Sequence, residues 1–230
     1  MTDSDSLAAR LESVRARIAA ACARADRDPA TVNLLAVTKS VSIDVVREAF
    51  ELGLTDFAEN RVQEAEAKVT DLAQAHWQLV GHLQSNKAGK AVELFDCIQS
   101  VDSVQLAERL DRLLKGSGRP TYPIYLQVNV DADPAKEGFD PAVLEEALPV
   151  LAALDHLELR GLMTVGRLAV RPEDARRTFV ALRSLSERLR TVEPRLGGGL
   201  SMGMSDDFEI ALEEGATVVR VGRALFGERS

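Results

Sequence analysis

The stretch VNLLAVTKSVS, Val32 to Ser42, decides between the two folds that the rest of the sequence allows. Its first half is mostly apolar, which is typical of a strand buried on both faces. In a dinucleotide-binding sheet, a glycine-rich GxGxxG turn would follow this strand and lead into a helix. The turn here reads TKSVS and contains no glycine. The stretch therefore argues against a dinucleotide-binding sheet.

Short apolar strands alternate with amphipathic helices from this stretch almost to the end of the chain. The predicted strands are residues 32–38, 56–59, 76–81, 97–101, 122–130, 157–164, 199–202 and 217–221. The predicted helices are residues 43–52, 61–73, 86–94, 103–115, 141–153, 172–191 and 206–214. Such a series fits an open doubly wound sheet or a closed (β/α)8 TIM barrel, and the count of eight strands favours the barrel. Gly197–Gly199 precede a strand rather than follow one, so we interpret them as a plain loop.

An extra helix precedes the first predicted strand. Apolar residues recur there at spacings of three and four, at Leu7, Leu11, Val14, Ile18 and Cys22. This periodicity predicts a helix over residues 7–25, which the sequence RDP then ends. We expect the segment 1–28 to pack on the barrel as an N-terminal helix. No linker or composition shift divides the chain, so residues 1–230 are predicted to form a single domain.

The composition excludes several classes of function. A formal net charge of −8 argues against nucleic-acid and anionic-membrane partners. No run approaches the ~20 apolar residues of a membrane span, and the N-terminus has no hydrophobic signal core. We therefore expect a cytoplasmic protein. No stretch indicates a large apolar interface, which favours a monomer.

The cysteines and histidines predict neither a disulfide framework nor a metal site. The two cysteines, Cys22 and Cys97, form no CxxC motif. The three histidines, His76, His82 and His156, lie far apart without paired ligand spacing.

Polar residues gather where the predicted strands end. The residues at these ends are Lys39, Asn60, His82, Ser100, Asp102, Asn129, Met163 with Thr164, Ser201, and Arg220 with Gly222, and all but Met163 and Gly222 have polar side chains. In a barrel the carboxyl ends of the strands form one face, and barrel enzymes place their chemistry there. Such polar groups are costly in a core unless they face a ligand. The pattern predicts a functional site at this face.

Lys39 stands at the end of the most hydrophobic strand in the N-terminal half, and lysine is otherwise rare in this chain. One interpretation is a rim lysine whose stem packs on the barrel while its amine reaches water. The other is a partly desolvated amine, whose lowered pKa favours attack on a carbonyl to form a Schiff base. Lys39 alone does not decide between them.

The last two predicted strands offer places for a phosphate. Ser201 to Asp206 form a turn into a helix, and Gly222 follows the eighth strand, where barrels commonly bind phosphate. Ordinary turn chemistry explains each place equally well when it is taken alone. A Schiff-base lysine opposite a phosphate site suits a phosphorylated aldehyde, and pyridoxal 5'-phosphate (PLP) is the obvious candidate.

Several longer motifs carry a family resemblance. They are LLAVTKSVS, FAENRVQEAEAK, WQLVGHLQSNK, IQSVDS, LQVNVDADPAKEGF, RGLMTVG, LSMGMSDDFEIALEEGATVVRVG and ALFGER, within residues 32–229. With these motifs the chain closely resembles the pyridoxal phosphate homeostasis protein family. The resemblance implies a single barrel like the N-terminal domain of alanine racemase. It also implies PLP bound as an aldimine to Lys39, without an established catalytic reaction.

The resemblance also implies roles for individual residues. Lys39 matches the lysine that holds the cofactor, and Arg220 matches an arginine that faces the pyridine nitrogen. The positions around the phosphate are matched by Ser201, Ser205 and Gly222.

Further matches lie near the cofactor ring. Asn60 matches an asparagine beside the ring, and Met163 and Thr164 fall at the ligand-facing end of the sixth strand. One departure is Gln99, where the family pattern leads us to expect histidine. We expect this departure to leave cofactor binding unaffected.

A cofactor carrier is the favoured function, with a weak amino-acid racemase as the alternative. An arginine donates only, so it would leave the pyridine nitrogen unprotonated and the ring a weaker electron sink. Racemisation needs two bases, and Tyr122 and Tyr125 are expected at the closed end of the barrel. The chain ends at Ser230, directly after the barrel, so we expect an open cofactor that suits buffering or delivery to apo-enzymes.

Two further hypotheses remain. An aldolase-like barrel would also use a lysine Schiff base, but it would be colourless and would need an acid–base partner that we cannot assign. Lys136, in the loop after the fifth predicted strand, could assist cofactor transfer as a second amine. We favour a solvated loop lysine at this position.

Overall fold

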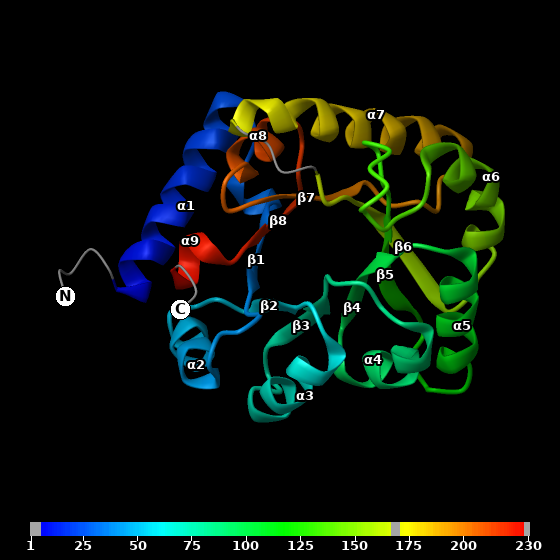
Figure 1. Ribbon diagram of the computed structural model, residues 1–230, viewed down its shortest axis with the longest axis horizontal. Helices are drawn as coiled ribbons and strands as arrows, with labels where there is room; N and C mark the ends of the chain where they lie inside the picture. Colours follow the sequence, from blue (N-terminus) through cyan, green and yellow to red (C-terminus); the bar gives the residue numbers. More distant parts are fainter. Residues whose placement is uncertain (1–5, 167–170, 228–230) are drawn as a thin grey trace.

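The computed structural model describes residues 6–166 and 171–227, in which eight parallel strands close into a barrel in the order β1 to β8 (Figure 1). The strands are β1 (Asn33–Val37), β2 (Asp56–Glu59), β3 (His76–Leu79), β4 (Cys97–Val101), β5 (Tyr122–Gln127), β6 (Leu157–Met163), β7 (Gly199–Met204) and β8 (Val218–Val221). Parallel pairing of β1 with β8 closes the barrel. This confirms the predicted closed barrel.

Helices follow the strands and surround them (Figure 1). They are α1 (Leu7–Arg24), α2 (Ile43–Glu51), α3 (Val62–Asp71), α4 (Ala88–Leu94), α5 (Val104–Leu114), α6 (Pro141–Ala152), α7 (Arg176–Val192), α8 (Phe208–Glu213) and α9 (Arg223–Phe226). Short 3-10 helices are η2 (Pro29–Thr31), η3 (Ser85–Lys87) and η4 (Pro172–Ala175). In the ranges 6–166 and 171–227, no helix is long and apolar enough to cross a membrane.

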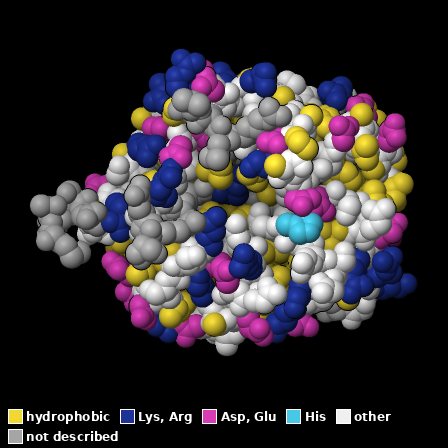
Figure 2. Space-filling view, viewed as in Figure 1, with side chains coloured by type: hydrophobic (Ala, Val, Ile, Leu, Met, Phe, Trp, Pro, Cys, Tyr) yellow, Lys and Arg dark blue, Asp and Glu magenta, His cyan; other side chains and the backbone are white. Residues whose placement is uncertain are grey.

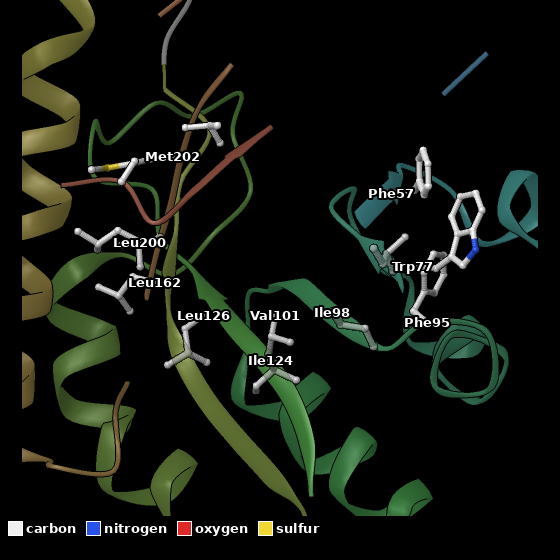
Figure 3. Close-up of a cluster of buried hydrophobic side chains, with 14 of the residues drawn as sticks. Phe57, Trp77, Phe95, Ile98, Val101, Ile124, Leu126, Leu162, Leu200 and Met202 are labelled. Carbon is white, nitrogen blue, oxygen red and sulfur yellow. The ribbon is translucent and has the colours of Figure 1, made fainter. Parts of the chain in front are cut away.

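The main hydrophobic core combines buried side chains of the strands and of the surrounding helices. Figure 3 shows part of it, where Phe57, Trp77 and Phe95 lie together. The rings of Phe57 and Trp77 have centroids 5.4 Å apart. A second, smaller cluster contains Leu35, Ala58 and Val218, all from strands. Since side chains alternate along a strand, this second cluster fills the inside of the barrel.

Helix α1 packs against α8 and α9 near the other end of the sequence (Figure 1). The Ser6 side chain caps its first turn, as the preference for serine at this position predicts. Arg17 donates two hydrogen bonds to the Glu209 carboxylate. After the helix, Arg27 donates to the carbonyl oxygens of Leu212 and Ala216 at 2.6 and 2.9 Å. These contacts hold the predicted N-terminal helix on the barrel.

Some boundaries differ from the predictions. β5 ends at Gln127 instead of residue 130, because Asn129 starts a hydrogen-bonded loop. The Asn129 side chain donates to the carbonyl oxygens of Asp133 and Lys136, and it accepts from the Asp133 N–H. β7 extends to Met204, beyond the predicted residue 202. The helices η2 and α9 were not predicted, since each spans one turn or less and leaves no periodic pattern.

Candidate functional site

Lys39 lies two residues beyond the end of β1, at the carboxyl-terminal face of the barrel. The residue before it, Thr38, is fully buried and donates its hydroxyl to the Glu59 carboxylate at 2.6 Å. The residue after it, Ser40, has a φ of +62°, so the chain turns sharply there. Lys39 itself is half-buried. The strand end is therefore fixed on both sides of the predicted cofactor-binding lysine.

A buried ion pair contacts this strand end at Thr38. Glu59, the last residue of β2, is fully buried, and its Oε1 lies 2.6 Å from Nζ of Lys68 on α3. Lys68 also donates to the carbonyl oxygen of Thr38 at 2.7 Å. The second carboxylate oxygen of Glu59 is buried without a hydrogen-bond partner among the described residues. This pair was not predicted from the sequence, because it depends on how α3 is rotated against β2.

Arg220 is 5% exposed and lies on β8. It donates to the Ser201 hydroxyl and to the Thr164 carbonyl oxygen, both at 2.7 Å. Burial lowers the pKa of Arg220 to about 10, and the nearby carboxylate of Asp207 opposes this shift. At neutral pH the guanidinium therefore remains a cation. These two bonds use two of the five N–H donors of a guanidinium, which leaves donors for an acceptor on a ligand.

The loop after β7 meets the start of α9. The Ser205 hydroxyl accepts a hydrogen bond from the Ala224 N–H at 3.2 Å, and Asp206 pairs with Arg223. Gly222 immediately precedes α9. The structure therefore brings together the loops that contain Ser205 and Gly222, at the place where the sequence predicts phosphate binding.

A glycine is required near the end of β7, just before this loop. Gly203 has a φ of +90°, and a Cβ there would lie 2.5 Å from the Cβ of Ala211 and 2.9 Å from the Cα of Phe208. A larger residue would push α8 away from the end of β7. The close approach of α8 thus depends on Gly203.

Met163 and Thr164 lie at the end of β6 and are buried. Thr164 donates its hydroxyl to the carbonyl oxygen of Val128 at 2.8 Å, and its N–H to that of Ser201 at 3.1 Å. The carbonyl oxygen of Thr164 accepts a hydrogen bond from Arg220. Thr164 is therefore a support for Arg220 and for the neighbouring strand ends.

Asn60, which is half-buried, follows β2 and touches the loop after β3 through its main chain. A Cβ on Gly81 would lie 2.1 Å from the carbonyl oxygen of Asn60. The two loops can approach this closely only because residue 81 has no side chain. Asn60 is held at the barrel mouth by this contact.

We expect Gly81→Ala to lower the free energy of unfolding by about 1–3 kcal/mol, because the added methyl group overlaps the Asn60 main chain. The matched control is Gly89→Ala in α4, where nothing lies within 4 Å of an added Cβ. This control should be neutral or stabilising by up to ~1 kcal/mol, as alanine favours helix. Urea denaturation measures the free energy of unfolding of both variants. Equal effects of the two substitutions would contradict the close contact between Gly81 and the Asn60 main chain.

Three further residues meet at the same face. His82 Nδ1 lies 3.0 Å from Asp102 Oδ2, and the potential ligand atoms of His82, Asp102 and Glu137 all lie within 4.8 Å of one another. His82 and Asp102 were predicted at strand ends, but their contact with each other and with Glu137 was not, because three separate loops contribute the residues. Figure 2 shows a central hollow on the face in view, bordered by basic and acidic side chains.

Comparisons with known proteins show the family of this chain. Residues 9–230 match the family described as alanine racemase, N-terminal domain. The pyridoxal phosphate homeostasis protein of Pseudomonas aeruginosa is 42% identical over 97% of this chain and 96% of that protein. The structure of PipY from Synechococcus elongatus with PLP bound has a TM-score of 0.86 at 42% identity, covering 96% of this chain and 100% of PipY.

A more distant structure shows the shared fold. An alanine racemase of Clostridium difficile has a TM-score of 0.75 at 14% identity, and the match covers 98% of this chain and 56% of that racemase. Its barrel is the one predicted from the sequence. By its family match and its closely similar relatives, the chain belongs to the alanine racemase N-terminal domain family and, within it, to the pyridoxal phosphate homeostasis proteins.

Proposed function

We propose that this chain holds PLP covalently on Lys39 and contributes to PLP homeostasis by buffering the cofactor or delivering it to apo-enzymes. The observation that carries the proposal is the position of Lys39, two residues after β1, together with the buried cation Arg220 on the adjacent strand β8. The relatives named above, one of them with PLP bound, support it.

The residues at this face fit the three functional parts of PLP. When bound, the cofactor supplies an aldehyde carbon that an amine can attack to form an imine. Lys39 provides this amine. Arg220 donates to the ring nitrogen and never accepts a hydrogen bond. Main-chain N–H groups of the loops around Ser205 and Gly222 bind the phosphate, since glycine lets the backbone approach an anion closely.

The two tyrosines of the chain are unsuited to act as a second base. Tyr122 is buried and donates its hydroxyl to the carbonyl oxygen of Phe95 at 2.7 Å. Burial raises the pKa of Tyr125 to about 12, so its phenol remains protonated at neutral pH. Since racemisation needs a base on each face of the substrate carbon, these tyrosines favour a carrier over a racemase. We therefore propose that the chain has no robust catalytic activity. Separately, and in line with the expectation from the sequence, we propose that it acts as a monomer.

The visible absorption spectrum of the purified protein, followed by borohydride reduction and peptide mass mapping, tests the proposal. We expect a yellow protein whose reduced adduct lies on Lys39, while Lys136 in the loop after β5 stays unmodified. A protein that stays colourless after PLP is added, or an adduct on a different lysine, would contradict it.

A further inference from the structure

A row of hydrogen-bonded polar side chains crosses the inside of the barrel. It begins at Arg220 on β8 and ends at Asp56 on β2. The inside of such barrels is usually filled by branched apolar residues. Its members, in order, are Arg220, Ser201, Gln99, Gln78 and Asp56. They come from β8, β7, β4, β3 and β2. We call this set the polar row.

Every hydrogen bond of the polar row is donated in the same direction. Arg220 donates to Ser201 at 2.7 Å, and the Ser201 hydroxyl donates to Gln99 Oε1 at 2.5 Å. Gln99 Nε2 donates to Gln78 Oε1 at 2.7 Å, and Gln78 Nε2 donates to Asp56 Oδ1 at 3.3 Å. The row therefore leads from a cation that only donates to a carboxylate that only accepts.

The two ends force this direction on the side chains between them. A glutamine amide can turn over and exchange its donor and acceptor, so by itself it has two orientations. Because Arg220 cannot accept and the Asp56 carboxylate cannot donate, one orientation of Gln99 and of Gln78 satisfies all the bonds. In that orientation the Ser201 hydroxyl donates to Gln99 and keeps its lone pairs for Arg220.

Burial makes the arrangement costly to disturb. Ser201 and Gln99 are fully buried, and Gln78 is 9% exposed, so water is a poor substitute for a lost partner. Asp56 is fixed by further donors, since it accepts from the Asn33 side chain at 3.1 Å and from the Thr55 hydroxyl at 2.9 Å. Asp56 also lines a cleft of about 530 Å³ beside the start of β1 and β2.

We propose that Asp56, Gln78 and Gln99 are positioning residues that fix the Ser201 hydroxyl and, through it, the direction of the Arg220 guanidinium. The inference rests on the proposed function, in which Arg220 donates to the cofactor ring nitrogen. Residue 99 is two hydrogen bonds away from Arg220, and a neutral histidine there would offer one acceptor and one donor as Gln99 does, so the departure at Gln99 is still expected to leave cofactor binding unaffected.

Two substitutions test the row at different points. Gln99→Met removes two hydrogen bonds at similar volume. Asp56→Asn keeps the shape of the side chain, but the new amide can donate a hydrogen bond where the carboxylate could only accept one. The side-chain amides of Gln78 and Gln99 then no longer have a single favoured orientation. We expect each to weaken PLP binding about five- to tenfold, as the loss of about one hydrogen bond implies, and to shift the visible absorption maximum.

The matched control and the rescue separate positioning from stability. Tyr122→Phe, at the start of β5, removes a buried hydrogen bond to the Phe95 carbonyl oxygen outside the row. It should leave affinity and spectrum as in the wild type, even if the protein melts at a lower temperature. Gln99→His should keep the PLP affinity and the absorption maximum of the wild type, because a neutral imidazole has one acceptor and one donor and keeps the direction of the row.

A measurement without cofactor makes the test independent of PLP. In the wild-type apo-protein, ¹⁵N NMR should show restricted rotation of the Arg220 guanidinium, with the signals assigned by their loss in Arg220→Lys. In Gln99→Met and in Asp56→Asn these signals should broaden or merge.

The outcomes distinguish this inference from the proposed function. A wild-type protein that never becomes yellow with PLP overturns the proposed function, whatever the NMR signals show. A yellow wild type, with Gln99→Met and Asp56→Asn variants that match it in affinity, spectrum and guanidinium signals, overturns the positioning role alone. If Tyr122→Phe shifts the spectrum as far as they do, the row has no special role.

Discussion

If Lys39 holds PLP as proposed, Lys39→Ala should abolish the covalent attachment of the cofactor and the yellow colour, and it should weaken cofactor binding by roughly 100-fold, about 2.7 kcal/mol. The reason is chemical, because alanine has no amine to attack the aldehyde. The contacts that fix the strand end, from Thr38 to Glu59 and Lys68, do not involve the Lys39 side chain and should persist. Titration of the apo-variant with PLP, followed by borohydride reduction and mass spectrometry, measures the effect.

Lys39→Arg is the matched variant for charge. It keeps a cation at the same place, but an arginine side chain stays protonated and forms no imine. We expect it to remain colourless like the alanine variant, with noncovalent binding of PLP at most. A yellow Lys39→Arg protein would show that another amine holds the cofactor.

Lys68→Met destabilises the fold by about 3–5 kcal/mol, because it leaves the Glu59 carboxylate buried without its cation. Glu59 is fully buried, and its second carboxylate oxygen already lacks a partner among the described residues. For a domain of this size, the melting temperature should fall by roughly 6–20 °C. Thermal and urea denaturation of the apo-protein measure the loss.

A double variant identifies the cause. Glu59→Gln combined with Lys68→Met removes both charges, so it should be more stable than Lys68→Met alone. If the double variant is less stable than the single one, the unpaired carboxylate is not the reason for the loss. Lys90→Met offers a surface control, because Lys90 pairs with Glu66 at 2.8 Å on an exposed face. It should have little effect on stability, because exposed ion pairs are screened by water and salt.

The barrel could be predicted from the sequence because each strand and helix has a local signature. The eight apolar runs and the helical periodicities between them match the observed elements closely. The closed topology followed from their number and from the turn at Thr38 to Ser42. The end of β5 could not be predicted, since the Asn129 side chain replaces strand bonds with loop bonds.

The polar contacts of the site were harder to predict. Reading the strand ends identified Lys39, Ser201 and Arg220 as candidates, because polar residues after apolar strands are visible in one sequence. The links between residues on different strands depend on register and on which way each side chain points. For this reason neither the pair of Glu59 with Lys68 nor the bond of Gln99 to Ser201 was foreseen.

The docking of α1 onto α8 has a consequence for synthesis on the ribosome. The ion pair of Arg17 with Glu209 joins residues that are 192 positions apart. At about 5–20 residues per second, α1 waits roughly 10–40 s before its partner helix emerges. During this interval α1, with Leu11 and Val14 on its apolar face, lacks its contacts with α8 and α9. The nascent chain should therefore need protection by a chaperone until β8 closes the barrel.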